Sequence, residues 1–236
     1  MAIIEQAVQP RIGYPESDGQ PIADNTKQFR WIVTIEGGID ALFKADPNVF
    51  VAGDLLWYPV EGQPTIHMAP DAMVVFGRPK GDRGSYQQWR EDGIAPQVVF
   101  DIRSPENRVA EMIKKFQFYD RYQVEEYYIY DPDRGELSGW ARAADGDLIA
   151  IDTMSGWVSP RMGVRFALND GELELYYPDG RKFASYLELV EQAEQSRQQA
   201  EQSRQQAEQS RQQAKQSQDR AERLAAQLRA LGVEPE

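Results

Sequence analysis

The sequence contains no cysteine and a single histidine, His67, among its 236 residues. The lack of cysteine excludes disulfide bonds and thiolate metal sites, and one imidazole cannot supply the ligands of a typical zinc site. A metal ion bound by this chain would therefore be held by carboxylates. No apolar run approaches the ~20 residues that span a bilayer, and residues 1–9 lack the basic and apolar parts of a signal peptide. We therefore expect a cytoplasmic protein with no membrane partner.

Basic side chains are outnumbered, and the net charge of −12 is unevenly spread. Residues 191–236 are nearly neutral, with eight acids and seven bases, so the excess negative charge lies in the rest of the chain. Such a body repels a phosphate backbone. Residues 78–121 run against this trend, with nine bases and seven acids. The one locally basic region surrounds the residues that carry the candidate chemistry.

Length and composition indicate one mixed α/β domain followed by a helical segment. We assign residues 1–20 to a loosely ordered arm, residues 21–182 to the domain and residues 183–236 to the helix. Within the domain, the apolar spacing over 25–43 predicts an amphipathic helix capped by Asp24 or Asn25, which Gly37-Gly38 weakens.

Runs rich in β-branched and aromatic residues predict the strands. The last of them, beyond residue 136, read as hairpins that complete one sheet or form its edge. The strand that ends at Ile102 is followed by Ser104 as a helix cap and Pro105 in the first turn, which predicts a helix to about Tyr122. The polar stretch 77–96 is a long loop, of a kind that is usually functional or mobile. The predicted strands cover 49–52, 54–58, 73–76, 98–102, 127–130, 137–140, 148–151 and 172–177.

A seven-residue repeat, Ala-Glu-Gln-Ser-Arg-Gln-Gln, begins at Ala193 and recurs from Ala200 and Ala207. With alanine at position a, serine and later leucine fall at position d, which is the register of a coiled coil. The seam is weak because alanine and serine bury little apolar area, and only its ends, such as Tyr186 and Leu189, are adhesive. We predict a long C-terminal coiled-coil helix that makes the chain a homodimer or pairs it with another protein. A solvated helical tail is the alternative.

Two acids attached to β-rich runs suggest a site. Asp71 follows Pro70 at the start of one predicted strand, and Asp101 lies inside another. Paired acids on neighbouring strands repel unless a cation lies between them, so they often mark a site for a hard cation. A divalent ion there would activate a water and orient a phosphodiester. The alternative is that Asp71 belongs to a turn and Asp101 is an ordinary strand residue.

Helix geometry selects one of two adjacent lysines. At ~100° per residue, and with Phe116 at the centre of the buried face, Lys115 lies at the edge of that face beside Arg108, whereas Lys114 points away. Lys115 can therefore reach the site. Glu111 lies one turn before Lys115, where it forms either an ion pair or a support for the lysine.

The ordered set of these motifs resembles the Uma2 family of the PD-(D/E)XK nuclease superfamily. The set comprises Pro70-Asp71 before a strand, Asp101 in a strand that ends in Ser-Pro, a Lys-Phe-x-x-Tyr helix from Lys115, and the strand Val-Glu-Glu-Tyr-Tyr-Ile-Tyr-Asp-Pro. The resemblance covers roughly residues 20–186. It implies a restriction-endonuclease-like core, in which helices flank a mixed β-sheet, and a metal-dependent nuclease site.

The resemblance also implies residue roles: Asp71 and Asp101 match the two acids, and Lys115 matches the lysine on the helix. The sequence departs from the pattern twice. Arg103 occupies the position where the wider superfamily has its lysine, and an arginine is too basic to act as a general base, so we assign it to a phosphate contact or to solvent. Asp101 replaces the usual glutamate, which withdraws the carboxylate by one methylene, ~1.5 Å.

Two functions are compatible with this sequence. The first is a nuclease that hydrolyses DNA phosphodiesters with Mg²⁺ or Mn²⁺ held by Asp71 and Asp101 and with Lys115 beside the attacking water. Arg103, Arg108 and Glu111 would support it, and Asp54 and Asp24 are lesser candidate acids. The second is a catalytically impaired nuclease-fold protein that assembles partners through its C-terminal heptads. The acidic net charge and the short acid at 101 favour the second function, and the locally basic flank favours the first.

Overall fold

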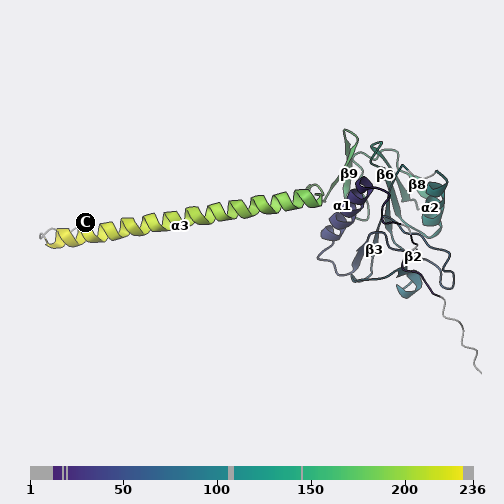
Figure 1. Ribbon diagram of the computed structural model, residues 1–236, viewed down its shortest axis with the longest axis horizontal. Coiled ribbons are helices and arrows are strands. Elements are labelled where there is room, and N and C mark those ends of the chain that lie inside the picture. The colour runs from purple at the N-terminus through teal and green to yellow at the C-terminus, as the bar shows by residue number, and fades with distance from the viewer. Residues whose placement is uncertain (1–12, 18, 20, 106–108, 145, 231–236) are drawn as a thin grey trace, which may run out of the picture. The chain divides into compact units, whose positions relative to one another are not determined.

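The computed structural model describes residues 13–17, 19, 21–105, 109–144 and 146–230. Most of the expected N-terminal arm, together with Arg108, lies outside these residues. The chain divides into two compact units, of which the first ends at Ser185 and the second begins at Tyr186. The first is a mixed α/β domain, and the second contains one long helix, α3 (Tyr186–Ala230) (Figure 1). Within the described ranges, no helix is both long and apolar enough to cross a membrane.

A six-stranded mixed sheet forms the centre of the domain. Its strands run in the order β1-β3-β5-β6-β7-β8, and every neighbouring pair is antiparallel except β5 and β6. This confirms the predicted α/β class. The strands are β1 (Val49–Ala52), β3 (Ala72–Phe76), β5 (Val98–Ile102), β6 (Glu126–Asp131), β7 (Glu136–Arg142) and β8 (Leu148–Ala150).

The parallel pair β5–β6 is joined by helix α2 (Val109–Arg121). A parallel connection must cross the sheet, which is why a helix lies between these two strands. The described part of the helix begins at Val109, and Pro105 lies in a turn; the predicted start between them falls on residues 106–108, outside the described residues. The Ser104 hydroxyl donates a hydrogen bond to the Asp24 carboxylate, and its role as a helix cap stays a prediction, because the residues it would cap lie outside the described ones.

Helix α1 (Thr26–Leu42) covers one face of the sheet. Asn25 caps it, since its side chain accepts hydrogen bonds from the backbone N–H groups of Lys27 (3.0 Å) and Gln28 (2.9 Å). The glycine pair does not break the helix. Gly38 is needed there because a Cβ at this position would lie 2.2 Å from the buried ring of Phe183.

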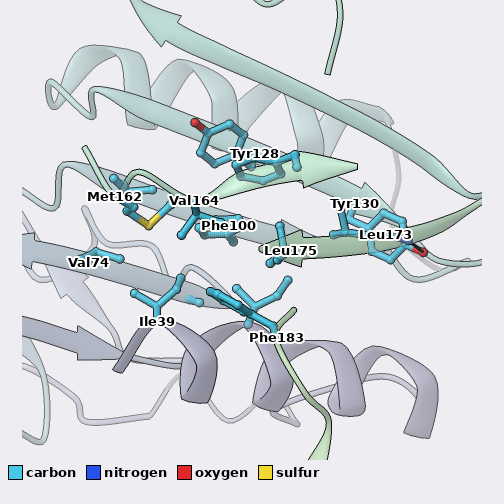
Figure 2. Packing of buried hydrophobic residues seen from close by; sticks show 14 of the residues in the cluster. Ile39, Val74, Phe100, Tyr128, Tyr130, Met162, Val164, Leu173, Leu175 and Phe183 are labelled. Carbon is cyan, nitrogen blue, oxygen red and sulfur yellow. Dashed lines mark hydrogen bonds between the residues drawn. The ribbon is translucent and has the colours of Figure 1, made fainter. Parts of the chain in front are cut away.

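The core beneath α1 joins that helix to the sheet and to a separate hairpin. The hairpin consists of β9 (Arg165–Asn169) and β10 (Glu172–Tyr176), which form a two-stranded sheet of their own, separate from the central sheet. The expectation that the late hairpins extend one sheet is thus correct for β7–β8 and wrong for β9–β10. Figure 2 shows this cluster, which includes Ile39, Val74, Phe100, Tyr128, Leu173, Leu175 and Phe183.

The opposite face of the sheet lies under α2 and is strongly aromatic. Its buried residues include Trp57, Tyr86, Tyr119 and Tyr127. Two short parallel strands contribute to this aromatic cluster: β2 (Trp57–Tyr58) and β4 (Tyr86–Gln87). The 3₁₀ helix η1 (Gln88–Arg90) follows β4 directly. The strand expected over 54–58 is therefore confined to its last two residues. This aromatic face also holds the candidate site.

Ion pairs fasten the long loop 77–96. Glu91 accepts hydrogen bonds from Arg78 Nε at 2.9 Å and Arg83 Nε at 2.8 Å, and all three side chains are largely buried. The hydrogen bond from Arg83 holds the pKa of the Glu91 carboxyl below its usual value, against the opposing effect of burial.

Helix α3 spans 45 residues, a length of ~68 Å at the rise of an α-helix. Its described side chains are almost all exposed, including Tyr186, Leu189 and Leu224. The helix is confirmed. Its pairing through the heptads stays a prediction.

Candidate active site

The two predicted acids lie on adjacent strands of the central sheet. Asp71 directly precedes β3, and Asp101 is the fourth residue of β5. In the antiparallel register of these strands Ala72 pairs with Phe100, so the two aspartates are close neighbours. Because side chains alternate along a strand, both lie on the face covered by α2. Both are buried, with 8% of Asp71 and 2% of Asp101 exposed.

Asp71 is held by the backbone of β5. Its Oδ2 accepts a hydrogen bond from the N–H of Ile102 at 2.5 Å. Burial is the main reason that the pKa of Asp71 rises to about 7, and the negative charge of Asp101 raises it further, against the opposing effect of Lys115. An uncompensated negative charge is therefore costly at this position.

Asp101 is bonded at both carboxylate oxygens. Lys115 Nζ donates to Oδ1 at 2.7 Å, and the Tyr127 hydroxyl donates to Oδ2 at 2.8 Å. Lys115 comes from α2 and Tyr127 from β6, so each of the two elements that follow β5 in the chain supplies one hydrogen-bond donor to Asp101.

Lys115 reaches the site from α2, and Lys114 is exposed, as the helix geometry predicts. Burial by itself would lower the pKa of Lys115, but the carboxylates of Asp101 and Asp71 raise it above its usual value. The side chain is therefore an ammonium ion at neutral pH. It can neutralise charge and donate hydrogen bonds, but it cannot act as a general base.

Two tyrosines complete the surroundings of Asp101. The rings of Tyr119 and Tyr127 lie 4.8 Å apart, edge to face, and both are fully buried. Burial, and after it the charge of Asp101, raises the pKa of both phenols well above the usual value, so both hydroxyls stay protonated. The sequence contained signals for both residues: Tyr119 lies one turn after Lys115, and Tyr127 lies in the strand parallel to β5.

Ile102, the residue after Asp101, is held through both of its backbone polar groups. The N–H of Ile102 bonds to Asp71, and its carbonyl accepts a hydrogen bond from Gln28 Nε2 of α1 at 2.8 Å. The Gln28 Oε1 in turn accepts from the N–H of Asp24 at 2.8 Å. Sequence reasoning missed Gln28. Asp24, a lesser candidate acid, takes part in this hydrogen-bond network through its backbone N–H.

The other candidate residues lie around the pair of acids without a hydrogen bond to either acid among those described. Arg103 Nη1 lies 3.4 Å from Asp131 Oδ2, and its Nε is buried without a hydrogen-bond partner among the described residues. Glu111 is exposed, and the Lys115 ammonium bonds to Asp101 instead of to it. Asp54 is half-buried and close enough for its charge to raise the pKa of Asp71 slightly.

The possible ligands for a divalent cation are the two carboxylates of Asp71 and Asp101. The described residues contain no cluster of three or more His, Cys, Asp or Glu side chains that could bind a metal. Two carboxylates are nonetheless enough for Mg²⁺, which commonly keeps several waters and takes one or two protein carboxylates. The raised pKa of Asp71 points the same way, because a cation beside both acids would offset their repulsion. Asp71 and Asp101 therefore fit such an ion.

Two acids on one face of a mixed sheet, with a lysine from the helix that covers this face, are the arrangement expected of a nuclease-like protein with a restriction-endonuclease-like fold. The profile of the Uma2 family, described as "Putative restriction endonuclease", matches residues 10–169. The chain belongs to the Uma2 family.

Among solved structures, the chain is similar to the crystal structure of "a putative nuclease belonging to DUF820" from Anabaena variabilis ATCC 29413. The two chains are 15% identical with a TM-score of 0.42, and the match covers 58% of this chain and 72% of the other. No significant match was found among curated proteins.

Proposed function

We propose that this protein is a divalent-metal-dependent nuclease that hydrolyses phosphodiester bonds of DNA. The observation that carries the proposal is the close arrangement of Asp71, Asp101 and Lys115, all largely buried on one face of the sheet. Membership of the Uma2 family supports the same chemistry. In this proposal Asp71 and Asp101 hold Mg²⁺ or Mn²⁺, which supplies a polarised phosphoryl oxygen and a more acidic water.

The protein residues have separate tasks in the hydrolysis. Water forms the new bond to phosphorus, the bond to the leaving oxygen breaks, and negative charge grows on the phosphoryl oxygens. The Lys115 ammonium offsets that charge and donates a hydrogen bond to the attacking water or to the phosphate. Asp71 must be ionised to act as a ligand, so activity should be low where its carboxyl is protonated.

Arg103 is suited to a phosphate contact. Its Nε–H is a buried donor without a partner in the described part of the chain, while Nη1 faces Asp131. A guanidinium can bind a phosphate through two parallel N–H groups. Since Arg103 lies two residues beyond Asp101, a phosphate bound there would be close to the reacting one.

A plasmid cleavage assay with matched variants tests the proposal. Purified full-length protein is incubated with supercoiled DNA in Mn²⁺, in Mg²⁺ and in EDTA. Asp71→Asn and Lys115→Ala should each reduce the cleavage rate by about 100-fold or more, because each removes a charged group from the reacting centre. Lys114→Ala is the matched control, since it removes the same charge from an exposed position one residue away. Cleavage that survives in both site variants, or in EDTA, would refute the proposal.

A second candidate function is assembly without catalysis. The long exposed helix α3, whose repeat places Ala and Ser on one seam, favours a scaffold that forms homodimers or binds a partner. Sedimentation of the full chain and of a chain that ends at Ser185 distinguishes the possibilities. A dimer that becomes a monomer on removal of α3 supports the scaffold, whereas a monomer in both cases removes this role.

A further inference from the structure

Asp101 sits between two donors that come from consecutive elements of the chain. Its carboxylate oxygens lie 2.7 Å from Lys115 Nζ and 2.8 Å from the Tyr127 hydroxyl oxygen. These are full-strength hydrogen bonds, with no space left between carboxylate and donors. The site is therefore closely fitted to the side chain that occupies it.

We propose that Tyr127 is a positioning residue and that Tyr127 and Lys115 together form a cradle built for aspartate at position 101. The short acid is then one half of a matched pair and not a damaged glutamate. The role of the cradle in metal binding rests on the proposed function, whereas its fit to aspartate does not.

A glutamate at this position would not fit without rearrangement. The extra methylene advances the carboxylate by ~1.5 Å, into atoms that already lie at hydrogen-bonding distance. Tyr127 cannot easily withdraw, because its ring is fully buried between Tyr119, at 4.8 Å, and Trp140, at 5.4 Å. A longer acid must therefore bend, break one hydrogen bond or displace packed rings.

The tyrosine hydrogen bond also fixes the rotation of the carboxylate. Lys115 alone holds one oxygen and leaves the group free to turn about it, whereas two donors on two oxygens define its plane. Each carboxylate oxygen keeps lone-pair capacity after it accepts one hydrogen bond. Asp101 can thus be held by Tyr127 and still serve as a ligand beside Asp71.

Tyr119 provides a matched control. Its ring packs against Tyr127 and is equally buried, and its hydroxyl is near enough to Asp101 to be affected by that carboxylate, but no partner among the described residues lies within hydrogen-bonding geometry. Tyr119→Phe and Tyr127→Phe remove the same atom from neighbouring rings. Only the second removes a hydrogen bond to Asp101 of ordinary length, 2.8 Å.

The first experiment measures urea unfolding in EDTA for the wild type, Tyr127→Phe, Asp101→Glu and the double variant. In the wild-type background Tyr127→Phe should lower the urea midpoint, because Asp101 loses a donor. In the Asp101→Glu background it should raise the midpoint, because loss of the hydroxyl makes room for the longer acid. A midpoint that falls by the same amount in both backgrounds would overturn the proposal.

The second experiment measures Mn²⁺ binding to the full chain by calorimetry. Tyr127→Phe should weaken binding by about 10- to 100-fold, the usual effect of removing a residue that orients a metal ligand. Tyr119→Phe should leave it unchanged. Equal losses in the two variants, or no loss in Tyr127→Phe, would remove the positioning role. If the wild type binds no Mn²⁺, the proposed function fails, and the urea experiment alone decides whether the cradle is fitted to aspartate.

Discussion

Replacement of Asp71 by asparagine should make the metal-free protein more stable at alkaline pH. The pKa of this carboxyl rises from its usual 3.8 to about 7, chiefly because the group is buried and secondly because Asp101 is negatively charged. A shift of about three pKa units corresponds to about 4 kcal/mol, at ~1.4 kcal/mol per unit. This is the largest free energy that ionisation of Asp71 can cost the folded state.

The sign follows from proton linkage. Because the folded-state pKa lies above the unfolded-state value, the folded protein binds the proton more tightly, and this contribution to stability is complete below about pH 4. It is lost as the pH rises through about 7. Asparagine keeps an oxygen for the Ile102 N–H and never ionises, so Asp71→Asn does not suffer this loss.

Thermal unfolding in EDTA at pH 4.5 and pH 8 measures the effect. The two proteins should melt at similar temperatures at the lower pH, and the variant should melt up to about 10 °C higher at pH 8, since ~1 kcal/mol moves the midpoint of a domain of this size by a few degrees. Excess Mg²⁺ at pH 8 should narrow the gap by stabilising only the wild type. A difference between the proteins that is independent of pH would refute the reasoning.

Two further predictions concern the fold. Gly38→Ala should destabilise the domain, because its Cβ meets the Phe183 ring at 2.2 Å, whereas Gly37→Ala, with nothing within 4 Å, should stabilise α1 by about 0.5–1 kcal/mol. Urea unfolding of both variants checks this, and equal effects would contradict it. Glu91→Gln should cost about 2 kcal/mol at pH 7, since two arginines lose a charged acceptor. The deficit should shrink at low pH, where Glu91 of the wild type is protonated, and a constant deficit would argue against the ion pairs.

The sequence predicted the parts of the fold that depend on local patterns. The strand Val98–Ile102 and a cap at Asp24 or Asn25, of which Asn25 is the one found, followed from β-branched runs and from helix-end chemistry, which operate within a few residues. The separate β9–β10 hairpin could not be foreseen, because the choice between joining a sheet and packing across its face depends on contacts made by distant residues. The hydrogen bond from Ser104 to Asp24 was hidden for a related reason, because the two residues lie 80 positions apart in the chain.

The candidate site shows the same division. The placement of Lys115 and the exposure of Lys114 followed from helix geometry alone. The hydrogen bond from Tyr127 to Asp101 did not, since it depends on the register of two parallel strands, in which Asp101 pairs with Ile129. Gln28 was hidden for the same reason, because an amide on a helix indicates nothing until the carbonyl opposite it is known.

The buried position of Phe183 determines where the chain can be truncated without loss of a core residue. The ring lies against Gly38 in the core of the domain, and its N–H donates to the carbonyl of Leu175 at 2.7 Å. A protein shortened after residue 182 would lose the Phe183 side chain and expose the apolar core residues that it covers. Such an exposed apolar surface favours aggregation that has nothing to do with α3. A protein shortened after Ser185 keeps Phe183 in the core. Any comparison of the domain with and without its helix should therefore use the later end point.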